Sequence, residues 1–394
     1  MTHSSPARAL AILSLLASSA GSWAHDGVSH DDDTDSAAPA QQLTLDLDLR
    51  QGRGSHTAPA ALVQIDHPAA ASLRELNADR STLAWQARWL PGLQTQWAVS
   101  YDREREQLAN DQAWLRWAAI PGSLALQAGR FSPAQALAAD EWGRSSLRDT
   151  LLTGGHDHWH DSGLALQLQQ PGRRLTLSAL RGESNPGTRR AGAQAGLWLL
   201  ALEQDLGPLQ LGLTAADTPR VSRQNALAGD GHSHSHGGAR GCQRTLACLN
   251  GDGQWLELAA RGQLYGVTLR GALGSRQEQG TLGSATGQVD YDGRTDWLAV
   301  EATTAAPLLA GVDASVRYER LRLRHTLTGT NAAILATEAG IASSQHQPEV
   351  IGVRLRWQPA KQQQGSLEWQ EDQTDARSRQ RWLLRWQHQF SLLP

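Results

Sequence analysis

Histidine is the residue type whose spacing most clearly indicates chemistry in this sequence. Three histidines and two aspartates share one short stretch: His156, Asp157, His158, His160 and Asp161. In an extended segment, side chains at i, i+2 and i+4 project to the same side, so the three imidazoles can converge on one ion. Neutral imidazole together with carboxylate suits zinc, copper or nickel. We therefore predict a weak divalent-metal site in this stretch.

Two other segments have a similar composition. His232, His234 and His236 repeat the spacing in a glycine-rich stretch, and His25 and His30 lie among aspartates near the N-terminus. The alternative is that histidines in loops are solvated and bind metal only incidentally, because no closed tetrahedral site is specified. We expect exchangeable capture of Zn²⁺ or another divalent ion, and no required cofactor.

The two cysteines, Cys242 and Cys248, follow the second histidine cluster. In an exported protein a local disulfide is the first expectation. A metal site that combines the thiolates with the neighbouring imidazoles is the alternative.

The N-terminus is typical of an exported protein. Arg8 precedes a short apolar run from Ala9 to Ala20, and Ser22-Trp23-Ala24 has the small-x-small pattern of a cleavage site. We predict a signal peptide over 1–24, a flexible His/Asp-rich segment over 25–42 and one folded domain over 43–394. The formal net charge of -3 argues against nucleic acid as a partner.

The elements that must position the histidines are alternating strands. Leu43, Leu45, Leu47 and Leu49 share one face of the first, and polar side chains occupy the other. About sixteen segments follow this period of two, an even number, as closed membrane barrels require. They cover 43–50, 83–89, 93–102, 113–119, 122–130, 164–169, 175–180, 196–203, 209–214, 255–261, 265–273, 297–302, 312–324, 351–357, 367–372 and 381–390.

The connections alternate between short and long. Tight turns are expected at 91–92, 121–122, 171–172, 207–208 and 262–263, and long loops over 51–82, 131–160, 215–253 and 326–348. Such spacing is typical of an all-β transmembrane antiparallel barrel with long extracellular loops and short periplasmic turns. A soluble β-sandwich has no reason to separate its loops by length.

The two faces of the strands have different chemistry. Outward faces and strand ends carry aromatic residues that favour a lipid interface: Trp89, Trp97, Trp357, Trp369, Trp382, Trp386 and Phe390. The opposite faces carry charges of both signs, so we predict a wet lumen of undecided ion selectivity. The predicted pore-lining residues are Arg88, Arg116, Arg270, Arg317, Arg354, Arg356, Glu368 and Arg385, joined by Asp46, Asp48, Glu319 and Asp372.

One junction resembles a known family. Gly129-Arg130-Phe131-Ser132-Pro133 is similar to the strand-to-loop joins of the phosphate-selective porin O/P family. The long segment that follows resembles the third outer loop of sixteen-stranded porins, which folds inward to constrict the pore. The resemblance implies passive diffusion of small solutes through the outer membrane. The sequence lacks the lysine-rich lumen expected for phosphate, since Lys361 is its one lysine.

We therefore predict a bacterial outer-membrane porin, not an enzyme, with a link to zinc uptake through its histidine-rich loops. Its expected partners are outer-membrane lipids, small solutes or divalent cations, and other copies in a homotrimer. A soluble periplasmic metal-binding β-protein and an anion-selective porin with incidental histidines are the alternatives. A TonB-dependent receptor needs an N-terminal plug for which no room precedes the first strand, and an enzyme needs a convergent nucleophile and base.

Overall fold

The computed structural model describes residues 41–54, 79–102, 107–137, 160–182, 196–226, 246–284, 286–304, 311–338, 345–373 and 379–393. The chain divides into two units, Met1–Asp35 and Ser36–Pro394. The first unit, including the predicted signal peptide and His25 and His30, lies outside the described residues. All that follows concerns the second unit.

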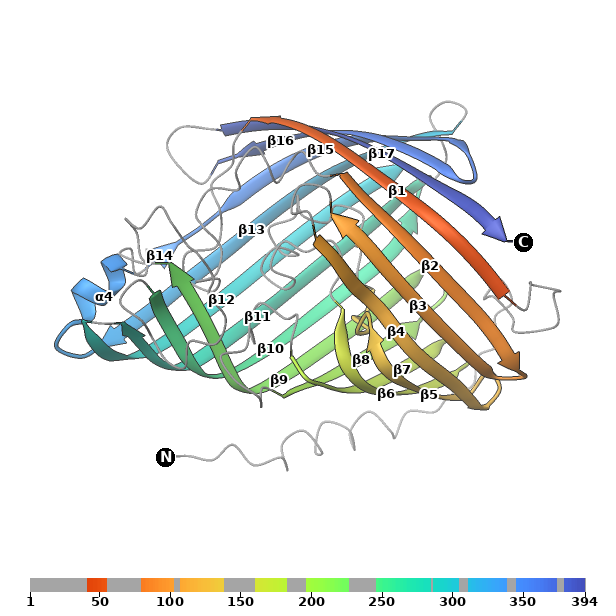
Figure 1. The fold of residues 1–394 in the computed structure, drawn as a ribbon. Coiled ribbons are helices and arrows are strands. Elements are labelled where there is room, and N and C mark those ends of the chain that lie inside the picture. The colour runs from red at the N-terminus through yellow and green to blue at the C-terminus, as the bar shows by residue number, and fades with distance from the viewer. Residues whose placement is uncertain are drawn as a thin grey trace. The chain divides into compact units, whose positions relative to one another are not determined.

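The second unit is one closed antiparallel sheet. Each long strand pairs with its neighbour in the chain, and the last strand, β17, pairs with the first, β1, so the sheet has no free edge (Figure 1). Sixteen long strands form the barrel, and the two-residue β14 adds one short pairing to β13. Each predicted strand corresponds to one long strand, so the predicted sixteen-stranded barrel is confirmed.

The first half of the barrel contains the shorter strands. Their bounds are β1 (Gln41–Gly54), β2 (Asp79–Leu90), β3 (Leu93–Asp102), β4 (Gln107–Ile120), β5 (Leu124–Phe131), β6 (Asp161–Gln170), β7 (Arg173–Leu180) and β8 (Leu197–Asp205).

The second half begins with five strands of 17 to 19 residues. These are longer than the roughly 9–11 residues that a tilted strand needs to cross a bilayer. The bounds are β9 (Leu209–Ala226), β10 (Leu246–Leu264), β11 (Val267–Ser284), β12 (Gly287–Thr304), β13 (Val312–Thr328), β14 (Gln345–His346), β15 (Glu349–Ala360), β16 (Gln363–Asp372) and β17 (Arg379–Leu393).

The predicted separation of long loops from short turns holds for most connections. Because neighbouring strands are antiparallel, the four long segments lie at one end of the barrel and the tight turns at the other. Three details were wrong. The turn between β10 and β11 is at Tyr265–Gly266, not Gly262–Gln263; β9 and β10 extend through much of the expected 215–253 loop; and a tight hairpin joins β11 to β12 at the long-loop end.

The outward face of the barrel is apolar on every strand. Each of the sixteen long strands exposes at least one large hydrophobic side chain, as Leu164 (63 %), Leu256 (49 %) and Leu298 (43 %) illustrate. In the final strand Trp382, Leu384 and Phe390 are exposed while Arg381 is buried, so the predicted alternation of that strand is confirmed. An apolar belt of this extent is unfavourable in water and suits contact with lipid.

Part of the inward face is also apolar, which the sequence did not indicate. Near the long-loop end of β8 to β13, Leu197, Leu249, Leu282, Leu321 and Leu323 are at most 1 % exposed. The extended strands thus build a buried hydrophobic cluster on one side of the interior.

A short helix belongs to the same cluster. Helix α4 (Ala332–Glu338) follows β13 and contacts β11, β12 and β13, and its Leu335 is fully buried. No helix in the described ranges is both long enough and apolar enough to cross a membrane.

Gly274 allows one of these inward contacts. A Cβ atom at Gly274 would lie 2.2 Å from Cζ2 of Trp297, whose indole nitrogen donates a 2.8 Å hydrogen bond to Glu257. We expect Gly274→Ala to displace this indole and destabilise the barrel by about 1–3 kcal/mol, the usual cost of overpacking. Urea unfolding of the refolded barrel in detergent measures the change.

The matched control is Gly271→Ala on the opposite face of the same strand. A Cβ atom there meets only the carbonyl oxygen of Ala299 at 3.9 Å, which is an ordinary contact. Equal unfolding midpoints for the two variants would contradict the assigned packing.

Candidate functional site

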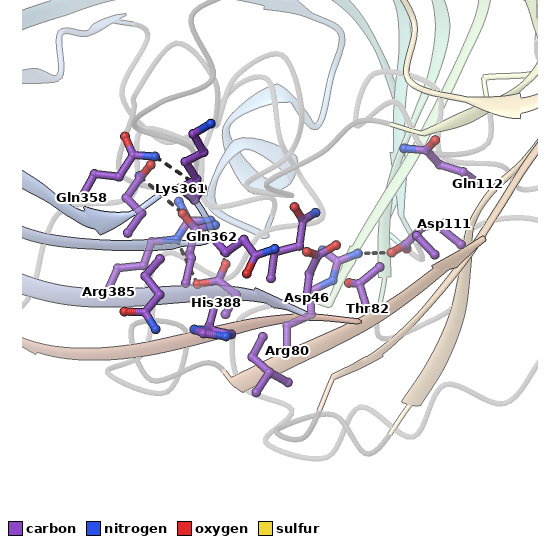
Figure 2. A pocket seen from close by; sticks show the side chains of 18 of the residues that line it. Asp46, Arg80, Thr82, Asp111, Gln112, Gln358, Lys361, Gln362, Arg385 and His388 are labelled. Carbon is purple, nitrogen blue, oxygen red and sulfur yellow. Dashed lines mark hydrogen bonds and ion pairs between the residues drawn. The ribbon is translucent and has the colours of Figure 1, made fainter. Parts of the chain in front are cut away.

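A polar cavity of the interior lies against the seam where the sheet closes. It has a volume of about 490 Å³ and is lined by β1 to β4, by the β15–β16 hairpin and by β17. Figure 2 shows Arg80 and Asp111 on one side of it, and Gln358, Lys361 and Arg385 on the other. We call this cavity the seam chamber. It runs from the short-turn end toward the middle of the barrel, because Lys361 lies in a tight turn and Asp48 in mid-strand.

Charges of opposite sign balance in the seam chamber. Three carboxylates line it together with three permanently charged bases: Asp46, Asp48, Asp111, Arg80, Lys361 and Arg385. Most of them are paired. Arg80 forms an ion pair with Asp111 and donates a 3.0 Å hydrogen bond to Ser100, and Arg385 lies 2.7 Å from Asp48. The chamber is therefore strongly polar but close to neutral.

Glutamine is the most frequent residue of the lining. Eight of the 20 lining residues are glutamines, and none of the eight is buried. They come from both sides of the chamber: Gln96 and Gln112 from β3 and β4, Gln358 and residues 362–364 from the β15–β16 hairpin, and Gln387 and Gln389 from β17. An amide side chain both donates and accepts hydrogen bonds, so this wall offers both functions without charge.

A β-bulge positions the acidic side of the chamber. In the pairing of β3 with β4, Ala98 faces Gln112 and Val99 faces Asn110, so Asp111 is the extra residue of the bulge. Because a bulge interrupts the alternation, Asp111 and Gln112 can both line the chamber. The sequence contains no turn or glycine signal that could have indicated this bulge.

His160 is the histidine of the first predicted cluster that lies within the described residues. It is 6 % exposed, lines the chamber, and its Nε2 atom lies 3.1 Å from Nε2 of Gln112. The next residue, Asp161, is fully buried and its Oδ1 atom accepts a hydrogen bond from the backbone nitrogen of Ser162 at 2.8 Å. The shared metal site predicted for these two residues stays a prediction.

The other predicted metal and disulfide residues are not placed. His156, Asp157, His158, His232, His234, His236 and Cys242 lie outside the described residues, and Cys248 is described only as part of strand β10. Among the residues that the structure describes, no group of three potential ligands is close enough to hold a metal ion. The predicted metal and disulfide roles stay predictions.

The start of the long segment after β5 runs along the inner wall. The backbone nitrogen of Ala136 donates a 2.8 Å hydrogen bond to the hydroxyl of Thr214, and Ala136 is 1 % exposed. A Cβ atom at Gly212 would lie 2.9 Å from Cβ of Ala136, so this glycine is needed for the close approach. The contact is with the inward face of β9, as expected for a loop that folds into a pore.

The predicted pore-lining residues lie in two different environments. Arg385 lines the seam chamber, and Arg88 and Arg116 continue the inward rows of β2 and β4. Arg317, Arg354 and Glu368 are instead buried.

Charge pairs connect arginines and carboxylates on β12, β13 and β15. Arg317 pairs with Glu319, Arg354 lies 3.9 Å from Glu301, and Arg356 lies 2.7 Å from Asp313. Arg270 lines a small cavity beside Glu301 and Arg317. Arg317, Arg354 and Arg356 are thus paired with carboxylates and do not form an unpaired cationic ring.

Arg80, Asp111 and the glutamines of the chamber were not among the residues predicted from the sequence. Arg80 and Thr82 continue the inward row of Ala84 beyond the predicted start of β2, so the alternation itself could have identified them. The recurrence of glutamine at inward positions of the predicted strands, such as Gln96 and Gln387, was a second available signal.

Comparisons with known proteins agree with this class of fold. OmpT expressed in the outer membrane of Vibrio cholerae matches with a TM-score of 0.55 at 10% identity, over 90% of this chain and 99% of that chain. OprB of Pseudomonas putida matches with a TM-score of 0.55 at 11% identity, over 89% of this chain and 94% of that chain. The outer membrane channel DcaP of Acinetobacter baumannii matches with a TM-score of 0.52 at 11% identity, over 89% of this chain and 96% of that chain.

No family model and no curated protein matches the sequence. At such low identity the structural likeness establishes the fold alone. The chain is a sixteen-stranded β-barrel of the outer-membrane type, with a polar chamber inside. The finer resemblance to the phosphate-selective porin O/P family stays a prediction.

The hydrogen bond to Thr214 gives a test of the inward segment. Thr214→Val leaves the buried backbone nitrogen of Ala136 without its acceptor, which costs about 1–3 kcal/mol. In a cysteine-free background with Ala136→Cys, we expect this change to accelerate labelling by a thiol reagent about tenfold or more.

Thr218→Val is the matched control, because Thr218 lies on the same strand as Thr214 but its hydroxyl donates to the carbonyl oxygen of Gly253 on β10. Equal labelling rates in both variants would show that Thr214 does not hold the segment in place.

Proposed function

We propose that this protein is an outer-membrane channel for the passive diffusion of small hydrophilic solutes. The observation that carries the proposal is the contrast between the two faces of one closed sheet. Every long strand exposes large hydrophobic side chains outward, whereas the seam chamber inside is polar and near neutral. A soluble periplasmic protein would expose this apolar belt to water, which disfavours that alternative.

The cellular location follows from the same contrast. In lipid, backbone groups of a sheet must pair internally, and a sheet without free edges meets this requirement. Among the similar structures named above, OmpT was expressed in the outer membrane and DcaP is an outer membrane channel. Export through a signal peptide over 1–24 fits this location. One matched OmpT structure is a trimer, which supports a homotrimer as part of the proposal.

Conductance tests the proposed function directly. The refolded protein should form open channels in planar lipid bilayers. Ala84→Trp adds a large side chain to the chamber lining and should lower single-channel conductance by roughly a third, since pore width limits ion flow. Leu115→Trp is the control, because Leu115 is on the same barrel wall but exposed on its outer face. A folded barrel without conductance would refute the proposed function.

Zinc is proposed as a solute that the histidines capture, not as a resident cofactor. The support is limited to His160, which lines the chamber beside Gln112 and carries one of the three imidazoles of the first cluster. His156 and His158 would complete the site with their neighbouring carboxylates, and His232, His234 and His236 would act as further capture ligands.

Replacement of His156, His158 and His160 by alanine should reduce or abolish the block of conductance by zinc, since imidazole is the expected ligand. Conductance before and after addition of zinc measures the effect, and the triple alanine variant of His232, His234 and His236 is the comparison. If saturating zinc leaves the wild-type conductance unchanged, the zinc proposal fails while the channel proposal stands.

A further inference from the structure

The composition of the seam chamber carries an inference about which solutes it favours. We propose that the chamber preferentially admits and weakly binds uncharged, polyhydroxylated solutes of saccharide chemistry, and that it discriminates little between anions and cations. This inference rests on the proposed channel function and specifies its substrate class.

The first argument is the chemistry of the lining. A hydroxyl group donates and accepts hydrogen bonds, and a glutamine amide offers both a donor and an acceptor at one position. Eight such amides surround about 490 Å³, within the usual range for small-molecule sites. A solute with many hydroxyl groups can exchange its hydrogen bonds with water for bonds to this wall, whereas a charged group, although it can hydrogen-bond to an amide, finds no opposite charge on glutamine to offset the loss of its hydration.

The second argument is the availability of these amides. Gln364 donates to Gln387 over 3.5 Å, which is a weak contact that a solute can replace. Gln96 and Gln363 line the chamber from opposite sides, and neither has a side-chain hydrogen bond within the described part of the chain. Groups that are partly exposed and not held by strong bonds can bind a passing solute without first breaking the structure of the wall.

The third argument is the cancellation of charge. Asp111 is neutralised by Arg80, and Asp48 lies between Arg50 and Arg385, each 2.7 Å away. Asp46 faces Gln389 across the seam and is hydrogen-bonded to it. The field of a close ion pair falls off faster than that of a single charge, and salt screens it within about 8 Å at physiological ionic strength. The chamber therefore lacks the one-sided ring of charge that makes a pore strongly ion-selective.

Three sugars of similar size and different charge test the inference: glucose, gluconate and glucosamine. Liposomes that contain the full-length protein should swell fastest in glucose, and reversal potentials in KCl gradients should give permeabilities for K⁺ and Cl⁻ that agree within about threefold. Faster entry of gluconate or glucosamine than of glucose, or a permeability ratio well above that limit, would overturn the inference.

Variants separate the role of the amides from that of pore size. Changing Gln96, Gln363 and Gln387 to leucine should slow glucose entry about threefold more than it lowers KCl conductance, because the hydrogen-bonding groups are lost at similar side-chain volume. The control changes Gln254, Gln277 and Gln279 to leucine, since these three are exposed on the outer face of β10 and β11. Equal effects of the two triple variants would overturn the inference.

A charge variant checks that the assay can detect selectivity. Asp111→Asn removes the partner of Arg80 and should shift both the reversal potential and the swelling order toward anions. The outcomes are distinguishable. Channels with strong charge discrimination overturn only this inference, whereas absence of any conductance overturns the proposed function and the inference with it.

Discussion

Closure of the sheet between its first and last strands is the constraint on which the rest of the structure depends. A sheet edge in lipid would leave backbone groups unpaired at a cost of several kcal/mol each. β1 and β17 remove both edges through a register of twelve pairs from Leu43 and Leu393 to Gly54 and Arg381. This register places Arg50 directly opposite Arg385, a like-charge pair that is unfavourable alone, and Asp48 binds both guanidinium groups. The seam chamber is thus built from residues that are more than 300 positions apart in the chain.

The period of two was enough to predict the strands, their inward and outward faces and the even strand number. This period could not locate the seam chamber. It assigns a residue to one face of the sheet, but it gives neither the position along the barrel axis nor the residue that lies opposite on the next strand. Two features decide the position and the neighbours of the chamber residues: the register between β1 and β17, and the bulge at Asp111. Each of them depends on how two strands pair, which a single strand's sequence does not specify. The inward arginines and carboxylates such as Asp48 and Glu319 were therefore recognised, whereas their pairing with one another was not.

The wrong turns and loops have local physical causes. The turn at Tyr265–Gly266 holds a non-glycine residue at φ 48°, which local preference disfavours, so Gly262 suggested the turn instead. Leu249-Asn-Gly-Asp-Gly253 also reads as a turn in isolation. In the barrel it lies inside β10, where a Cβ atom at Gly251 would lie 1.9 Å from the carbonyl oxygen of Gln279. Close pairing between long strands overrides the local signal there.

The division of the interior explains why composition alone could not indicate selectivity. Glu301, Arg317, Glu319 and Arg354 are inward-facing, but all four are buried and at most 7 % exposed. Charges that a solute cannot approach contribute little to its passage, and the buried pairs largely cancel at a distance. The inward face of β8 to β13 is apolar near the long-loop end, whereas the wall at the seam is polar. If the proposed channel function holds, a solute meets the residues that closure brings together at the seam, and counting every inward charge overestimates the electrostatic field in the chamber.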